Sequence, residues 1–248
     1  MKIVYILWLR QIKRFIRSKS RIVGSVVQPL MFLLALGFGF GPVFAKAGQG
    51  NYIQFLASGI IAMSVLFTSV FSGMEIIWDR QFGFLKETLV APVSRFQIML
   101  GRTLGGATVA FFQGTIVFFI SLIAGFRPTS GMGILLGFIS MAMMAVIFTA
   151  VGIAIASKMD DPHGFQMIMN FMVQPLFFLS GALFPLDGLP KALGSVIRIN
   201  PLTYAVDGMR GAFTGVTHFG LGMDMIVLTV VMISFLSLGA YLFSKIQI

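Results

Sequence analysis

The chain has 248 residues, of which 57% are hydrophobic and only 10% are charged, and its mean hydropathy is +0.95. A soluble domain of this size needs a far more polar surface, so the composition indicates helices packed in lipid. The net charge of +10 does not indicate nucleic-acid binding, because the basic residues fall mainly where membrane topology places them. Since the chain contains no cysteine, disulfides, thiol nucleophiles and iron–sulfur clusters are excluded.

Residues 1–21 carry a helical pattern with two different faces. Basic side chains recur at helical spacing on one face: Arg10, Lys13, Arg14, Arg17 and Arg21. Apolar side chains share the opposite face: Tyr5, Trp8, Leu9, Ile12, Phe15 and Ile16. The pattern predicts an amphipathic helix that lies in the membrane interface, and a basic leader that only sets topology is the alternative.

Six apolar stretches are long enough to span the roughly 30 Å hydrocarbon core of a membrane. They cover residues 22–41, 52–77, 101–125, 132–156, 165–185 and 223–243. An even number of spans places both termini on one side of the membrane. If that side is the cytosol, thirteen Lys and Arg residues lie inside and five lie outside, so the positive-inside rule predicts cytosolic termini.

The connection after the second span, residues 78–100, is the longest on the inner side. Its middle, GFLKETLVAPVSR at residues 83–95, mixes apolar and charged side chains. Pro92 ends any helix that begins after Gly83. We therefore expect a short helix that faces the cytosol.

The outer connection, residues 182–222, contains Pro185, Pro190 and Pro201 but is otherwise rich in Leu, Ile, Phe and Ala. A connection this apolar is unfavourable in water. We therefore expect short helices that dip back into the outer leaflet and form an ordered cap, shielded by the bundle.

Motifs for catalysis and nucleotide binding are absent from the sequence, which has no G-x-x-x-x-G-K-[ST], G-x-S-x-G or H-E-x-x-H pattern. His163 and His218 lie on opposite sides in this topology, and the run from Asp160 to His163 indicates a helix cap rather than a metal site. Glu75 is the one acidic residue that we place inside a span. We expect it to snorkel or to pair with Arg80 rather than to carry protons.

Three stretches together resemble a known family. They are DRQFGFLKETLVAPVSR at 79–95, GRTLGGATVAFFQG at 101–114, and FMVQPLFFLSGALFPLDGLP at 171–190 with INPLTYAVDGMRG at 199–211. The chain resembles the type-2 ABC transporter permeases, and within them it is most similar to the daunorubicin-resistance and nodulation-export branch. The likeness covers nearly the whole length, in order.

The resemblance implies one all-α permease domain over residues 1–248, with six transmembrane helices. Residues 1–21 correspond to the amphipathic connecting helix, residues 79–95 to the coupling-helix loop, and residues 182–215 to an outer re-entrant helical hairpin. Such a chain is a transport subunit rather than an enzyme. It lies in the cell membrane as a multi-pass protein with both termini cytosolic.

Members of this family pair with a second permease, either a copy or a paralogue, and with two ABC ATPase subunits. The resemblance implies that this chain binds no cofactor, and that ATP and Mg²⁺ are bound by the partner ATPase. It implies export of an amphipathic, lipid-like or drug-like substrate, or of a lipid-linked glycan. The alternatives are an ion- or proton-coupled secondary transporter and, more remotely, an intramembrane enzyme.

The family's coupling helix corresponds here to Gly83–Pro92. The expected ATPase-coupling residues are Gly83, Phe84, Leu85, Lys86, Glu87, Leu89, Pro92 and Arg95. We expect Phe84, Leu85 and Leu89 to enter a groove of the ATPase. Lys86 stands where many relatives carry an acidic residue and Glu87 follows it, so either side chain is a candidate for the orienting charge contact.

Two further groups of residues complete the predicted sites. The outer hairpin is expected to be held together by Gly181, Pro185, Asn200, Pro201, Tyr204, Asp207 and Arg210. Asp207 and Arg210 are three residues apart on a predicted helix, so we expect them to form an ion pair. The substrate pathway at the interface of the two permeases is expected to be lined by Met172, Phe177 and Phe178.

Overall fold

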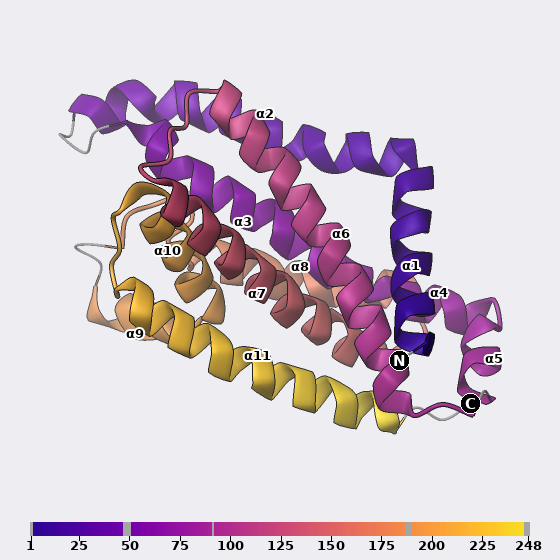
Figure 1. Ribbon diagram of the computed structural model, residues 1–248. Helices are drawn as coiled ribbons and strands as arrows, with labels where there is room; N and C mark the ends of the chain where they lie inside the picture. Colours follow the sequence, from indigo (N-terminus) through magenta and orange to yellow (C-terminus); the bar gives the residue numbers. More distant parts are fainter. Residues whose placement is uncertain (1, 47–50, 91, 187–189, 246–248) are drawn as a thin grey trace.

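The computed structural model describes residues 2–46, 51–90, 92–186 and 190–245 (Figure 1). Residues 187–189 of the predicted hairpin and the side chain of Arg21 lie outside the described part. Within the described ranges the chain forms eleven helices and no strand. They are α1 (Lys2–Arg17), α2 (Lys19–Lys46), α3 (Tyr52–Ser72), α4 (Met74–Gln81), α5 (Phe84–Val90), α6 (Arg95–Ile123), α7 (Gly131–Ala156), α8 (Pro162–Phe178), α9 (Lys191–Ile199), α10 (Pro201–Thr214) and α11 (Leu221–Ser244).

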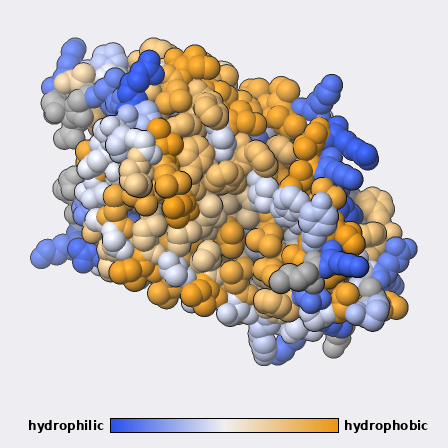
Figure 2. Space-filling view, viewed as in Figure 1, coloured by the Kyte–Doolittle hydropathy of each residue, from blue (hydrophilic) through white to orange (hydrophobic). Residues whose placement is uncertain are grey.

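Five helical segments of the described chain are long and apolar enough to cross a membrane: Ile22–Lys46, Tyr52–Gln81, Arg95–Ile123, Gly131–Ala156 and Leu221–Ser244. They match five of the six predicted stretches. Figure 2 shows apolar side chains over the middle of the bundle and hydrophilic ones gathered toward its ends. The all-helical fold is therefore confirmed, with five candidate membrane spans in the described chain, but the count of six spans is not.

The predicted span at 165–185 becomes the shorter helix α8, which has 17 residues. At 1.5 Å per residue α8 is about 26 Å long, a little less than the hydrocarbon core. The helix ends at Phe178, and the chain then turns at Gly181, whose φ of +71° favours glycine. The predicted end at residue 185 was therefore too far along the chain.

Helix α3 lies at the centre of the bundle and packs against α2, α6, α7 and α10. Where α3 gives way to α4, Gly73 lies against the backbone carbonyl of Gly152 on α7, and any β-carbon at either position would collide with the opposite backbone. Small residues thus allow the backbones to approach closely, as is usual where lipid gives no hydrophobic driving force between helices.

One end of the bundle carries α4, α5, the start of α1 and the end of α11 (Figure 1). Helix α1 packs along α6, where Leu7 lies beside Gly101 and Gln11 beside Gly105. A helix over the first residues was predicted, but α1 ends at Arg17. After Ser18 the chain turns into α2, so residues 19–21 belong to the first spanning helix rather than to the connecting helix.

The opposite end carries α9 and α10. Every residue of α10 from Leu202 to Phe213 is buried, against α3, α7 and α11. The Thr129 backbone N–H, in the connection between α6 and α7, donates a hydrogen bond to the Phe213 carbonyl and fixes the end of α10. Helix α10 is therefore enclosed by the bundle, as predicted, whereas α9 is mostly exposed and buries Ile197.

Candidate functional site

Helices α4 and α5 form a bent projection at one end of the bundle. Gly83 makes the bend with a φ of +80°, a left-handed conformation that other residues adopt only with strain. Thr88 donates its hydroxyl hydrogen bond to the Phe84 carbonyl within α5. Pro92 follows the end of α5, so the short helix lies where the sequence pattern predicts it.

The faces of α5 differ from the prediction. Leu85 is only 2% exposed and Leu89 packs against the core, so these side chains attach α5 to its own bundle. The exposed residues are instead Phe82 at 79%, Val90 at 77%, and the charged Lys86 and Glu87. The expectation that Leu85 and Leu89 enter a partner's groove is wrong, because the nearest apolar surface for that stripe is the bundle itself. We call Phe82, at the end of α4, and Lys86, Glu87 and Val90, on α5, the outer face of the projection.

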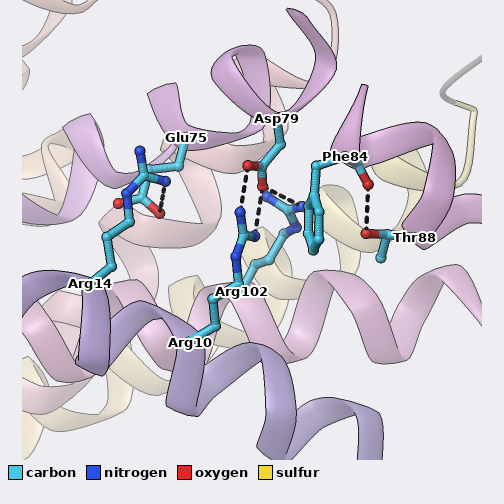
Figure 3. Close-up of polar contacts among 7 residues, drawn as sticks. All are labelled: Arg10, Arg14, Glu75, Asp79, Phe84, Thr88 and Arg102. Carbon is cyan, nitrogen blue, oxygen red and sulfur yellow. Dashed lines mark hydrogen bonds and ion pairs between the residues drawn. The ribbon is translucent and has the colours of Figure 1, made fainter. Parts of the chain in front are cut away.

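An ion-pair network connects the projection to α1 and α6 (Figure 3). Asp79 on α4 accepts hydrogen bonds of 2.9 and 2.7 Å from the two terminal nitrogens of Arg10 on α1. Its other partner is Arg102 on α6, at 2.7 Å, and the Arg102 side chain is 2% exposed. Asp79 and Arg102 are buried and Arg10 is partly exposed, so the buried carboxylate joins three helices at one point.

Arg10 makes a further contact with the projection. Its guanidinium lies over the ring of Phe84, 3.9 Å from the ring centre, so one side chain contacts both α4 and α5 (Figure 3). The hydrogen bonds to Asp79 hold the pKa of Arg10 above its ordinary value. Phe84 was predicted to face the ATPase, but it is half-buried beneath this cation.

The charges next to Asp79 have other partners. Glu75 lies 3.7 Å from Arg14 on α1, while Arg80 pairs with Asp160 and donates to the carbonyls of Ser157 and Met159. The predicted Glu75–Arg80 pair is therefore wrong. Two residues five apart on a helix point roughly 140° away from each other, so the side chains turn toward different neighbours.

The connection between α7 and α8 contains the predicted helix cap. Asp161 accepts hydrogen bonds from the backbone N–H groups of Gly164 and His163, which caps α8 and lowers the pKa of this carboxyl group. Arg95, at the start of α6, donates a hydrogen bond to the carbonyl of Ser244 at the end of α11. These contacts fix the start of α8 and join the start of α6 to the end of α11, next to the projection.

At the other end, the predicted hairpin residues make mainly local structural contacts. Asn200 caps α10 by accepting from the Leu202 backbone N–H, and its side-chain amide donates to the carbonyl of Leu176 on α8. Pro201 occupies the first turn of α10, where a proline costs no hydrogen bond. The Tyr204 hydroxyl donates to the carbonyl of Arg198 on α9.

Asp207 and Arg210 do not pair with each other, which corrects the prediction. Asp207 accepts hydrogen bonds from the backbone N–H groups of His218 and Phe219, before α11. Arg210 donates to the carbonyl of Gly181 and lies 3.7 Å above the ring of Phe55. Burial lowers the pKa of Arg210 to about 10. Each side chain has its own partners, so a spacing of three residues on one helix was not enough to predict an ion pair.

Pro185 and Arg210 both line a cavity of about 490 Å³ at this end. The predicted pathway residues on α8 do not share one face: Phe177 is 3% exposed, Met172 is half-buried against the core, and Phe178 is exposed. Phe177 therefore faces the interior of this chain, and its assignment to the pathway is wrong. Met172 and Phe178 stay candidates.

One buried carboxylate escaped the sequence analysis. Asp224 on α11 is 0% exposed, lies beside Gly208 and Ser140, and its two oxygens have no hydrogen-bond partner among the described residues. It falls inside the predicted stretch 223–243, so Glu75 is not the one acidic residue within a span. The sequence did contain a signal for this site, because an acidic residue within an apolar stretch indicates a functional carboxylate.

The chain is similar to known transport proteins. The family model "ABC-2 type transporter" matches residues 3–214. Nodulation protein J of Rhizobium meliloti (strain 1021) is 28% identical over 222 residues, which cover 88% of this chain and 84% of that protein. The inner membrane transport permease YadH of Escherichia coli (strain K12) is 27% identical over 234 residues, which cover 92% of this chain and 90% of that protein. The chain belongs to the ABC-2 type transporter family.

Proposed function

We propose that this chain is the membrane-spanning subunit of an ATP-driven exporter, and that separate ABC ATPase subunits bind ATP and Mg²⁺ and supply the energy. The observation that carries the proposal is the projection of α4 and α5. It is fixed to α1 and α6 through Asp79, yet its outer face is exposed to solvent and mixes apolar with charged side chains. A patch of this kind suits a protein partner.

The projection has the properties of a lever. A push on the part of the outer face that lies on α5 reaches α4 across Gly83. From Asp79 on α4 it reaches Arg10 on α1 and Arg102 on α6. Closure of two ATPase subunits would move both projections of a permease pair as rigid bodies. Alternating access would then follow from two packing arrangements of the pair.

The topology that we propose has six spans, with α8 as the fifth and both termini in the cytosol. Helix α8 begins beside Asp160, next to Arg80, and reaches Asn200 at the other end of the bundle, which supports counting it as a span. The excess of Lys and Arg at the projection end supports a cytosolic location. The membrane is the cell membrane in this proposal, and α9 and α10 form the outer hairpin.

The substrate would move between this permease and a second one, either a copy or a paralogue. Exposed apolar side chains on α8, including Phe171 and Phe178, support a pathway for an amphipathic, lipid-like or drug-like substrate, or for a lipid-linked glycan. Such a surface suits apolar chains better than hydrated ions.

The experiment is co-purification of the chain with its ATPase subunit after changing the outer face. Phe82→Ala with Val90→Ala should weaken ATPase binding by about 2 kcal/mol, the cost of losing an interface anchor, and should abolish transport. The matched control is Phe119→Ala with Ile123→Ala, which removes two exposed apolar side chains from α6. Undiminished ATPase binding and transport in the first variant would remove the basis of the proposal.

Asp224 favours one alternative, a secondary transporter coupled to ions or protons. An unpaired carboxylate in a membrane bundle is a common feature of ion-coupled transport. Vesicles that contain the chain without an ATPase distinguish the two functions. Uptake driven by an imposed ion gradient, and lost in Asp224→Asn, would establish the alternative.

A further inference from the structure

A basic concavity lies in the elbow between α1 and α2. It is an open hollow of about 960 Å³, lined by Ile6, Leu9, Arg10, Lys13, Arg14, Arg17, Ser18, Lys19 and Ser20. Five of the nine side chains are cationic and none is acidic. Figure 2 shows hydrophilic side chains along the edge of the molecule where α1 meets α2 in Figure 1. Like charges gather around one concave surface, which is unfavourable unless an anion neutralises them.

The cations in the elbow fall into two groups. Arg10 and Arg14 have partners on α4, because Asp79 and Glu75 lie next to them. The other three are Lys13, Arg17 and Lys19, which are exposed and form no ion pair with any described residue. The elbow therefore holds three positive charges that the described part of the chain does not balance.

Apolar side chains accompany these charges. Ile6 and Leu9 contribute to the lining, and Tyr5 and Ile16 are exposed on the same helix. A small inorganic anion would gain nothing from this apolar surface. A ligand that combines a phosphate group with hydrocarbon chains would gain from both parts.

We propose that the elbow between α1 and α2 binds the phosphate headgroup of an anionic phospholipid from the leaflet at the projection end. The headgroup would lie between Lys13 and Arg17 on α1 and Lys19 on α2, and the acyl chains would follow the apolar side chains of α1. Because Arg10 and Arg14 lie in the same concavity, the bound lipid would fix the position of the helix that holds α4. This inference does not depend on ATP as the energy source.

The test measures lipid retention by the purified full-length chain in neutral detergent, using native mass spectrometry. The probes are phosphatidylglycerol and phosphatidylcholine with identical acyl chains, and inorganic phosphate is a competitor. The variant Lys13→Gln with Arg17→Gln and Lys19→Gln leaves Arg10 and Arg14 unchanged. Each lost cation should weaken phosphatidylglycerol binding by about fivefold, which corresponds to about 1 kcal/mol. Arg17→Gln alone should show one such step.

The matched control is Lys46→Gln with Lys191→Gln and Arg198→Gln. It removes the same charge from exposed side chains outside the elbow and should retain phosphatidylglycerol as the parent does. Equal losses in both triple variants would show attraction to net charge and overturn the proposal. Equal retention of both lipids by the parent would also overturn it. Displacement of the lipid by millimolar inorganic phosphate would identify a free-anion site instead.

Discussion

Asp79 joins α4 to α1 through two hydrogen bonds from Arg10, 2.7 and 2.9 Å long. The same carboxylate balances Arg102, which is buried within α6 and whose Nε and Nη1 atoms have no other partner among the described residues. One acidic side chain therefore holds two cations on different helices. If it loses its charge, a buried cation is left without compensation.

Asp79→Asn should lower the free energy of unfolding by about 3–5 kcal/mol, which is the usual cost of breaking a buried ion pair from one side. Thermal unfolding of the detergent-solubilised chain measures this change. The double variant Asp79→Asn with Arg102→Met should lose less than the sum of the two single variants, because it removes the orphaned charge as well.

The control for this prediction is Asp160→Asn. Asp160 also pairs with an arginine, Arg80, but its side chain is largely exposed to solvent. An exposed pair contributes about 0–1 kcal/mol, so this substitution should hardly change stability. A similar loss in both variants would contradict a special role for Asp79.

Gly83→Ala should impair coupling because of backbone strain rather than steric collision. The φ of Gly83 is +80°, and no heavy atom lies within 4 Å of the position that an added β-carbon would take. The left-handed conformation costs a non-glycine residue about 1–2 kcal/mol, which favours a different angle between α4 and α5. Transport should fall while membrane insertion is unchanged.

Gly24→Ala is the matched control for Gly83→Ala. Gly24 also has nothing within 4 Å of an added β-carbon, but it lies inside helix α2, where alanine is favoured. It should leave stability and transport unchanged or slightly raised. Full transport by Gly83→Ala would show that the bend carries no mechanical function.

Leu85→Ala and Val90→Ala should affect different properties, since Leu85 is buried and Val90 is exposed. Loss of the buried Leu85 side chain should destabilise the attachment of α5 by about 2 kcal/mol or more. Val90→Ala should change stability by less than about 0.5 kcal/mol and should weaken ATPase binding. Proteolysis at α5 measures the first effect, and co-purification of the ATPase measures the second. If Leu85→Ala weakened ATPase binding without loss of stability, Leu85 would contact the ATPase, as the sequence predicted.

The residues of α5 show what the sequence can and cannot decide. Its apolar stripe, its glycine start and its proline stop are local features, so the helix was predicted within a residue or two. Which surface that stripe contacts is not local. Leu85 alternates with charged residues in the same way whether it packs on its own bundle or on a partner, and only the folded chain distinguishes the two.

The ion pairs also show that local sequence features do not predict contacts between distant parts of the chain. Arg10 and Asp79 are 69 residues apart, and their pairing depends on how α1 crosses the end of α6. The expected pairs, Glu75 with Arg80 and Asp207 with Arg210, were inferred from neighbours on one helix. In both cases the side chains have better partners on other elements, because a buried charge turns to the best available counter-charge or carbonyl.

Asp207→Asn and Arg210→Met should have nearly additive effects on stability. The two side chains hold different segments: Asp207 binds the backbone at His218, and Arg210 binds the backbone at Gly181. Side chains that hold different segments should couple weakly, whereas the two members of a buried pair couple by about 0.5–3 kcal/mol. A double-mutant cycle on thermal unfolding measures the coupling. A double variant much more stable than the sum of the single losses would indicate a direct pair.

The last prediction tests the six-span topology, and with it whether α8 crosses the membrane. Labelling of an introduced cysteine has no background from other cysteines, since the chain has none of its own. Glu87→Cys lies on the projection, Asp161→Cys precedes α8, and Ser195→Cys lies on α9, all at exposed positions. A membrane-impermeant maleimide added to intact cells should label position 195 alone, and positions 87 and 161 should react only after the membrane is opened. If α8 did not cross, positions 161 and 195 would share one side and would be labelled or protected together. Labelling of position 87 in intact cells would place the projection outside, where no ATPase could reach it.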